Sequence, residues 1–460
     1  MKKILMIALS LLLSTSLVAC SQNETEVVEE ESETIIIKSN DYVSKDSIEV
    51  NETIENAEDG EHAIEVSNEE ESYSNIKVIK TGDSSGDEAD FYGENAALVV
   101  SDDGTLNLDE IIVETNGTHA NGVFSYGTGT VNISNSYIET SGNCSGGLMT
   151  TGGGTTNANN LYIHTSGNSS AAIRSDRGGG TVNVDECYYI TDGKGSPVIY
   201  SPADITVSNA YLESTSAQGV VVEGENGVVL ENVELVANNV SKNSDKSDYY
   251  QAVMIYQSMS GDADEGLAYF TMIDGSLTNK SGDIFFVNNT VATISLTNVK
   301  INNLDENGVF LRAEAAGWGN EGSNGGHVTL KLSNQNVEGD IVVDDISSLN
   351  MYLTDSSTYN GAINQENEDG EIYVEIEEGS KWVLTGDSYI TSLTCQSGSI
   401  DTNGYKLYIN GEEYVEGNTY NGEAVVVATT NSNSQSHNNS MPQGTPPEKP
   451  NSSNNKEEKR

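Results

Sequence analysis

Hydrophobic and polar positions alternate in short runs along this chain, and each run ends at Gly or Asn before it reaches helical length. Alternation with a period of two is typical of strands with one buried face, and the interruptions predict tight corners. The pattern also recurs at a fixed interval. Similar segments start at Thr105, Thr130, Thr155 and Thr181, in steps of 25, 25 and 26 residues. Looser copies start at Asp204, Gly227, Tyr269, Thr293, Thr329, Ser348 and Glu371.

This interval predicts the fold class. One such unit cannot bury its own apolar face, so the units must stack and share a core. A leucine-rich repeat would need a Leu/Asn consensus, and a propeller would need a period of ~40 residues or more. We therefore predict an all-β protein, a right-handed parallel β-helix (solenoid) of about twelve coils. The predicted bounds are 35–92 for an N-terminal capping region, 93–411 for the β-helix and 412–429 for a C-terminal cap.

Composition and charge narrow the possible partners. The chain has 71 Asp and Glu against 21 Lys and Arg, a formal net charge of −50. The resulting field repels polyanions, so we expect no nucleic-acid partner. Hydrophobic residues make up 36% of the chain, Gly numbers 45 and Pro 6, which favours turn-rich β-structure. Cys144, Cys187 and Cys395 lack metal-ligand spacing, and we expect them to be small buried residues without disulfides.

The N-terminus has the organisation of a secretion signal. A short basic region, Met1 to Lys3, precedes an apolar run that is too short to span a bilayer comfortably. The following Leu17-Val18-Ala19-Cys20 resembles the lipobox of bacterial lipoproteins. The resemblance implies cleavage before Cys20, lipid attachment to its thiol and a place on the extracellular face of the bacterial cell membrane, held there by the lipid alone. An ordinary signal peptide with a chance cysteine is the alternative. The predicted segments are 1–19 for the signal peptide, 20–34 for an acidic tether and 430–460 for a disordered tail.

Stacked repeats turn equivalent positions into columns about 4.8 Å apart. Counted from the residue after the starting residue of each unit, the fifth position is Asn in most units. This column resembles the asparagine ladder of pectate-lyase-like β-helices and is expected to be structural. Its members are Asn135, Asn160, Asn209, Asn232, Asn298 and Asn334. The seventh position holds an outward tyrosine column, Tyr137, Tyr162, Tyr188 and Tyr211. This column either stacks on itself to protect the sheet or forms an alternative platform for sugar rings.

A second outward column is predicted at Phe124, Met149, Arg174, Tyr200 and Glu223, and Arg312 is expected to extend it. Tyr126 and Asp176 lie beside this column. The chain has four Arg, and two of them, Arg174 and Arg177, belong to this region. Scarce cations on an acidic protein suggest a contact with an anion or a hydroxyl group, and charge balance against Asp176 and Glu314 is the alternative.

Two steps of the repeat are long and predict projecting loops, which often form binding sites on solenoids. The loop after Thr293 contributes Trp318 and His327. In the loop after Gly227, Asp262, Asp264 and Glu265 could offer oxygens to Ca²⁺, although their spacing is not that of an EF-hand and a solvated acidic turn is the alternative. The candidate glycan-binding residues are Phe124, Tyr126, Arg174, Asp176, Arg177, Tyr200, Arg312, Glu314, Trp318 and His327.

Several segments are more specific than a generic β-helix. They are residues 80–91, 118–127, 170–180, 256–264 and 382–390. Together they resemble a family of secreted or anchored β-helix proteins of anaerobic bacteria that are described as adhesin-like or carbohydrate-binding. The resemblance covers about residues 76–411 and implies the pectate-lyase-like superfamily fold, but it offers no catalytic residues to transfer. The segments that a polygalacturonase needs are not found, and Arg174, Asp176 and Arg177 supply too few carboxylates for the calcium site of a pectate lyase.

Three functions remain open. The first is an anchored surface protein that binds polysaccharide or a cell-surface glycan, or acts as an adhesin, with no required cofactor. The second is a polysaccharide lyase or hydrolase, for which no catalytic residue is predicted. The third is a structural spacer without a specific ligand. An acidic rod would repel an acidic polymer unless Ca²⁺ bridged the two, so neutral glycans are favoured.

Overall fold

The computed structural model describes residues 42–242 and 244–427. The predicted signal peptide, the lipidation site Cys20, the acidic tether and the tail at 430–460 lie outside these residues. In the described part of the chain, helices are too short or too polar to pass through a bilayer.

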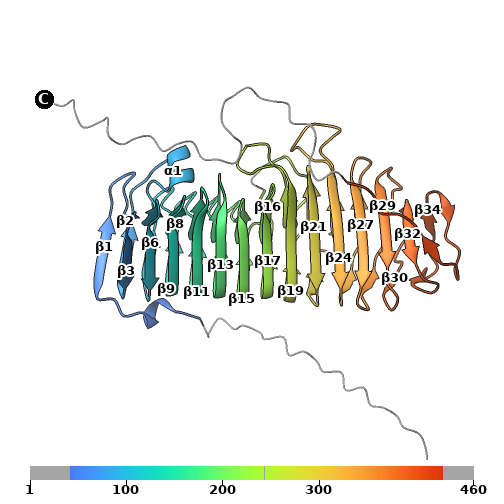
Figure 1. Cartoon of the computed structure of the whole chain (residues 1–460), viewed down its shortest axis with the longest axis horizontal. Helices are drawn as coiled ribbons and strands as arrows, with labels where there is room; N and C mark the ends of the chain where they lie inside the picture. Colours follow the sequence, from blue (N-terminus) through green and yellow to red (C-terminus); the bar gives the residue numbers. More distant parts are fainter. Residues whose placement is uncertain (1–41, 243, 428–460) are drawn as a thin grey trace, which may run out of the picture. The chain divides into compact units, whose positions relative to one another are not determined.

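The chain forms a parallel β-helix, as the repeat predicted (Figure 1). Successive coils add strands to an 18-stranded sheet, here sheet A, and an 11-stranded sheet, here sheet B. Sheet A contains β1 (Glu52–Asn56), β3 (Glu70–Ser74), β4 (Ile76–Lys80), β6 (Thr105–Asp109), β7 (Ile112–Thr115), β9 (Thr130–Thr140), β11 (Gly154–Thr165), β13 (Gly180–Thr191), β15 (Asp204–Ser214), β17 (Gly227–Ala237), β19 (Leu267–Asn279), β21 (Thr290–Thr297), β22 (Lys300–Asn303), β24 (Gly326–Ser333), β27 (Ser348–Thr354), β29 (Glu371–Ile376), β32 (Ser392–Cys395) and β36 (Tyr420–Asn421).

Sheet B faces the other side of the shared core. It contains β2 (Ile64–Ser67), β5 (Leu98–Ser101), β8 (Val123–Tyr126), β10 (Leu148–Thr151), β12 (Ile173–Ser175), β14 (Ile199–Ser201), β16 (Val220–Glu223), β18 (Gln251–Tyr256), β20 (Asp283–Asn288), β23 (Leu311–Ala313) and β26 (Ile341–Val343). Two smaller sheets complete the last coils. They contain β25 (Asn336–Glu338), β28 (Thr358–Asn360), β30 (Lys381–Val383) and β33 (Ile400–Asp401), and β31 (Ser388–Ile390), β34 (Leu407–Ile409) and β35 (Glu412–Glu413).

The register of sheet A follows the sequence repeat. Thr130, Thr155 and Thr181 are paired neighbours on β9, β11 and β13, and Asp204 follows on β15. Because side chains alternate along a strand, Val131 and Ile133 point inward and are buried in one continuous apolar core. This continuous core is what no single coil could form.

The corner asparagines explain why the long strands of sheet A bend. The six members of the predicted ladder all have a left-handed backbone, with φ between 48° and 54°. Asn adopts this conformation more readily than most residues with a side chain. The side chain of Asn160 also donates a hydrogen bond of 2.8 Å to Asn135. The asparagine ladder is therefore structural, as predicted.

The β-helix begins earlier than the expected boundary at residue 93. β1 already pairs in parallel with β4, and β2 pairs with β5, so residues 52–80 belong to the coil stack. The alternation in this region is weaker because β1 and β3 each contain a single hydrophobic residue, Ile54 and Tyr73, which hid these strands from the sequence pattern. At the other end, β35 and β36 pair antiparallel with β34 and β32 in the region predicted to be the C-terminal cap.

Candidate functional site

The register of sheet B confirms most of the second outward column. Phe124, Met149, Arg174 and Tyr200 are successive neighbours on β8, β10, β12 and β14, and Arg312 continues the same column on β23. The exception is the position after Tyr200. Val221 takes it, and Glu223 lies two residues further along, opposite Tyr256. The step from Tyr200 to Val221 is 21 residues, shorter than the 25 or 26 residues of the preceding steps, and the repeat interval did not predict it.

Segments inserted between the strands cover this column, so it is not open to a ligand. These inserted segments are residues 81–97, 257–266 and 314–325. α1 (Asp87–Tyr92) projects above β8, and longer loops project from the same side further along the stack (Figure 1). Phe124 is completely buried in a small cluster with Val99 and Met149, and Tyr126 packs against it. The sequence predicted Phe124 to be a ligand contact, but it is a core residue, because a helix inserted between β4 and β5 covers it.

The three arginines of this face are held by carboxylates. Arg174 lies 3.3 Å from Asp90 of α1 and 2.9 Å from Asp176. Asp90 also pairs with His119 at 3.2 Å. Because the guanidinium group already has these partners, charge balance, the alternative from the sequence, describes Arg174 better than a free ligand contact.

Arg177 and Arg312 follow the same rule. Arg177 donates to Asp262 at 2.9 Å, and its guanidinium lies 4.4 Å from the centre of the Phe91 ring. Arg312 donates to Asp283 at 2.7 Å and to Glu314 at 3.0 Å. The ion pairs through Asp90 and Asp262 tie the inserted segments to the coils, whereas Arg312 joins neighbouring coils through Asp283 of β20.

Burial raises the pKa values of four carboxyl groups on this face, those of Asp176, Glu223, Asp283 and Glu314. The pKa of Asp176 rises to about 7, with Asp262 and Asp90 adding to the effect of burial, although Arg174 acts in the opposite direction. Glu223 accepts hydrogen bonds from Tyr200 and Tyr256. Such groups are potential acids in catalysis, but Asp176 and Glu223 are buried, and Asp283 and Glu314 are paired with Arg312.

The acidic loop does not fit a calcium site. Asp262 is engaged by Arg177, and the backbone carbonyl of Asp264 accepts from the Glu225 amide. Across residues 42–242 and 244–427, no three His, Cys, Asp or Glu side chains lie together in a way that could hold a metal ion. The set Asp262, Asp264 and Glu265 therefore has the arrangement of a structural turn.

The tyrosine column points outward, as alternation predicted, and it stacks on itself. The ring centres are 4.8 Å apart between Tyr137 and Tyr162, and 4.6 Å apart between Tyr188 and Tyr211, with nearly parallel planes. The faces of these rings are therefore occupied by one another. The segment before β1 also lies over the column, and the ring centres of Tyr42 and Tyr188 are 5.0 Å apart. This arrangement suits protection of the sheet better than a platform for sugars.

The remaining candidates separate into two places. His327 lies on β24 of sheet A, hydrogen-bonded to Ser348 at 2.9 Å, and burial lowers its pKa. Tyr200 and Trp318 instead meet at a small cavity on the outer side of sheet B, with Tyr249 and Tyr256. The predicted glycan-binding residues thus do not form one site.

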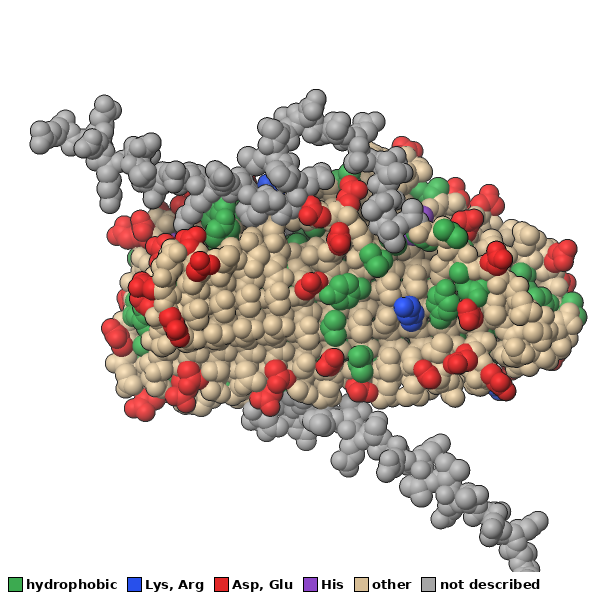
Figure 2. Space-filling model, viewed as in Figure 1, with side chains coloured by type: hydrophobic (Ala, Val, Ile, Leu, Met, Phe, Trp, Pro, Cys, Tyr) green, Lys and Arg blue, Asp and Glu red, His purple; other side chains and the backbone are tan. Residues whose placement is uncertain are grey.

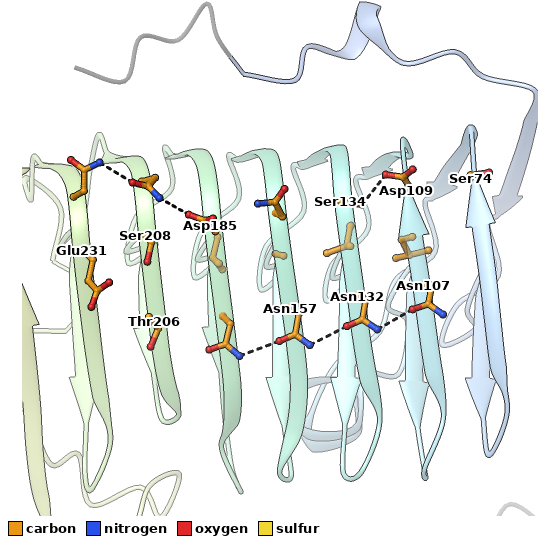
Figure 3. Close-up of a pocket in the computed structure, with 18 of the residues that line it drawn as sticks. Ser74, Asn107, Asp109, Asn132, Ser134, Asn157, Asp185, Thr206, Ser208 and Glu231 are labelled. Carbon is orange, nitrogen blue, oxygen red and sulfur yellow. Dashed lines mark hydrogen bonds between the residues drawn. The ribbon is translucent and has the colours of Figure 1, made fainter. Parts of the chain in front are cut away.

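An open site on sheet A was not predicted. It is a shallow groove of about 1140 Å³ that crosses strands from β3 to β19, with polar side chains from every coil on its surface. Figure 3 shows Asn107, Asn132 and Asn157 in one row along it, and Asp109, Ser134 and Asp185 in a second row nearer the bend. We call this surface, with Asn183 completing the first row, the amide groove.

Hydrogen bonds hold the first row of the amide groove in a fixed orientation. Asn132 donates to Asn107 at 2.9 Å, Asn157 to Asn132 at 3.0 Å and Asn183 to Asn157 at 3.1 Å. Each of these bonds uses one N–H of the donor and one lone pair of the acceptor. An amide has two N–H groups and an oxygen with two lone pairs, so Asn132, Asn157 and Asn183 each keep a donor and an acceptor for solvent or ligand. Asn107 also donates to Glu70 and Ser72, so it keeps an acceptor alone.

The amide groove carries negative but no positive side chains. Its lining includes Asp109, Asp185, Glu231 and Asp274 and no Lys, Arg or His. Asp109 accepts from Ser134 at 2.7 Å and from Asn135 at 2.8 Å, so its charge is partly satisfied within the protein. On the face of sheet A, a broad stretch of uncharged polar side chains and backbone lies between acidic groups (Figure 2). The site therefore offers hydroxyl-binding groups to an uncharged ligand.

The sequence does contain the signal for this row. Every strongly repeated unit starts with Thr-x-Asn, at Asn107, Asn132, Asn157 and Asn183. The corner ladder and the tyrosine column were predicted from the sequence, but this outward row was not. Period-two alternation alone places it on the surface.

Comparisons with known protein families, with characterised proteins and with solved structures give no match for this chain.

Proposed function

We propose that this protein binds an extended, uncharged polysaccharide along the amide groove, on the outside of a bacterial cell to which a lipid on Cys20 anchors it. The observation that carries the proposal is the row of four asparagine amides, one coil apart, all with an acceptor to spare and three of them with a donor as well. A polysaccharide repeats its hydroxyl groups at an interval similar to the coil spacing of about 4.8 Å. The amides of the protein and the hydroxyl groups of the ligand thus repeat at similar intervals, so successive coils can bind successive sugars.

The charge of the groove supports an uncharged ligand. Four carboxylates line it without a cation, so a chain of uronic acids would meet repulsion. Hydrogen bonds from fixed amides to sugar hydroxyls need no ionic partner, and the ordered amides lose little freedom on binding because they already hold one another.

The enzymatic alternative has less support. A lyase or hydrolase needs an acid or a base that reaches the sugar. The described carboxyls whose pKa is raised do not line the amide groove; they are Asp176, Glu223, Glu234, Asp283 and Glu314. The spacer alternative differs from both because it predicts binding to no glycan.

A polysaccharide array tests the proposal. The purified protein should be retained by one or more neutral polysaccharides, without release of shortened products, and a chelator should not change this retention. Retention on uronic-acid polymers alone would overturn the assignment to an uncharged ligand. Product release would favour the enzyme, and retention on no polysaccharide would favour the spacer.

A further inference from the structure

A second cavity lies on the opposite side of the coils from the amide groove. It has a volume of about 190 Å³ and lies on the outer side of β14, β16 and β18. Its walls include the rings of Tyr200, Tyr249, Tyr256 and Trp318. Drug-sized ligands occupy pockets of roughly 300 Å³ or more, so this cavity suits a single ring.

An unsatisfied polar atom in this cavity indicates the chemistry of its ligand. Gln251 lines the cavity and is only 2% exposed, and its amide oxygen has no hydrogen-bond partner among the described residues. Its amide nitrogen lies 3.3 Å from the Met254 sulfur. A buried acceptor without a donor is costly, and a hydroxyl group in the cavity would satisfy it.

The charged groups behind the cavity walls have partners. Both Tyr200 and Tyr256 donate their hydroxyls to Glu223, at 2.5 and 3.1 Å. The Arg312 guanidinium is paired with Asp283 and Glu314 and lies 3.6 Å from the centre of the Tyr249 ring. Lys242 is the one charged side chain among the described residues that line the cavity, and its ammonium group donates to the Ser247 carbonyl at 2.7 Å and lies 5.2 Å from the centre of the Tyr250 ring. Because these lining residues include no carboxylate and their single cation already has partners, the cavity favours a neutral ligand.

The walls are also held in place before a ligand arrives. Trp318 meets Tyr256 edge to face, with ring centres 5.2 Å apart. The Asn324 side chain donates to the Trp318 carbonyl at 2.8 Å and to the Ala316 carbonyl at 2.6 Å, which fixes the turn that carries the indole. A preformed pocket loses little entropy on binding.

We infer that this cavity binds one neutral sugar ring, with its apolar face against Trp318 and Tyr256 and a hydroxyl donating to the Gln251 oxygen. Aromatic walls together with a few fixed polar groups are what a sugar ring requires, because it has apolar faces and a polar rim. The ring could be a free monosaccharide or the terminal unit of a glycan. The inference does not depend on the amide groove.

Tryptophan fluorescence provides a direct test, because the chain has two tryptophans and Trp382 is fully buried in the core. A titration with neutral hexoses and their methyl glycosides, and separately with neutral oligosaccharides ending in the same sugars, should give a saturable change from Trp318. Stronger binding of the oligosaccharides would identify a chain end as the source, and equal or weaker binding would identify a free sugar. A linear response to every sugar would overturn the inference.

Variants distinguish specific binding from a general effect. Gln251→Leu should weaken binding about tenfold without loss of thermal stability, because it removes an acceptor that has no partner in the fold. Trp318→Ala should abolish binding. Because this variant lacks the fluorescent side chain, its binding is measured by ligand-observed NMR. Gln365→Leu is a matched control that should bind normally, because Gln365 donates to Asp340 and does not line the cavity. Unchanged affinity in both Gln251→Leu and Trp318→Ala would overturn the inference.

Discussion

At the scale of single residues, the left-handed asparagines show how one side chain serves two purposes. Asn160, with φ of 53°, turns the strand, and its side chain also donates a hydrogen bond to Asn135 in the preceding coil. The backbone requirement and the side-chain bond are separate contributions, and substitutions can distinguish them.

Asn160→Ala should destabilise the central coils by about 2 kcal/mol, because Ala meets the left-handed backbone at a cost of about 1 kcal/mol and also loses the hydrogen bond. Asn160→Gly should cost only about 1 kcal/mol, because Gly adopts this backbone freely. Hydrogen exchange of the backbone amides of β9, β11 and β13 measures the difference locally. Equal effects of the two substitutions would contradict the assigned role of the backbone.

The pairing of His119 with Asp90 predicts a pH dependence. Hydrogen bonding to Asp90 and Cys144 raises the pKa of His119 from 6.5 to about 9, although its burial opposes this. Since the folded pKa is higher than the unfolded one, the stabilisation is present in full below about pH 6.5 and is lost as the pH rises through about 9. This difference in the pKa of His119 contributes at most about 3 kcal/mol to the free energy of unfolding.

The free energy of unfolding, or the exchange of the α1 amides, should fall between about pH 6.5 and 9 in the native protein. His119→Gln should flatten this part of the profile. Asp90, Cys144 and Arg174 face the same site, so the comparison must be made between the two profiles rather than from one alone. A His119→Gln profile that falls as steeply as the native one would show that another group is responsible.

At the scale of elements, α1 decides which surface of sheet B is open. The helix has only six residues, and it is held by the Asp90 ion pairs and by contacts of Phe91 and Tyr92. Without it, the buried cluster around Phe124 would face solvent. Its role is therefore that of a cover attached by long-range contacts.

Phe124→Ala should destabilise the region under α1 by roughly 3 to 5 kcal/mol, as expected for a large buried aromatic residue. Increased hydrogen exchange in α1 and β8 would report this loss. Leu304→Ala is a suitable control, because Leu304 is 62% exposed and its truncation should change stability by less than about 0.5 kcal/mol. A Phe124→Ala protein as stable as this control would show that the cluster does not support α1.

The same element marks the limit of prediction from sequence. The Thr-initiated repeat was sufficient to predict the coils, the inward residues and the column that joins Phe124 to Arg174, because these depend on period and alternation alone. The cover was not predictable, because the Asp90 to Arg174 pair joins residues 84 positions apart. No local pattern indicates that an outward side chain will be buried by a distant insertion.

At the scale of the whole molecule, the chemistry of the surface is distributed unevenly. The described arginines lie on the side of sheet B, all in ion pairs with carboxylates, whereas the amide groove on sheet A has carboxylates and uncharged polar groups. The groove was missed from the sequence because Asn, Ser and Thr in a strand do not stand out against the many polar residues of the chain. Only the three-dimensional stack brings them into one continuous surface.

The central claim is that the asparagine row of the amide groove binds a neutral polysaccharide, and calorimetry with the best ligand from the array tests it most directly. An Asn132→Ala and Asn157→Ala double variant should bind at least tenfold more weakly, through the loss of hydrogen bonds worth about 0.5 to 1.5 kcal/mol each. The control is Asn302→Ala on β22, an amide that bonds to Thr278 outside the groove. The account predicts native affinity for Asn302→Ala and a clear loss for the double variant, and it would be contradicted by a folded double variant that binds as tightly as the native protein.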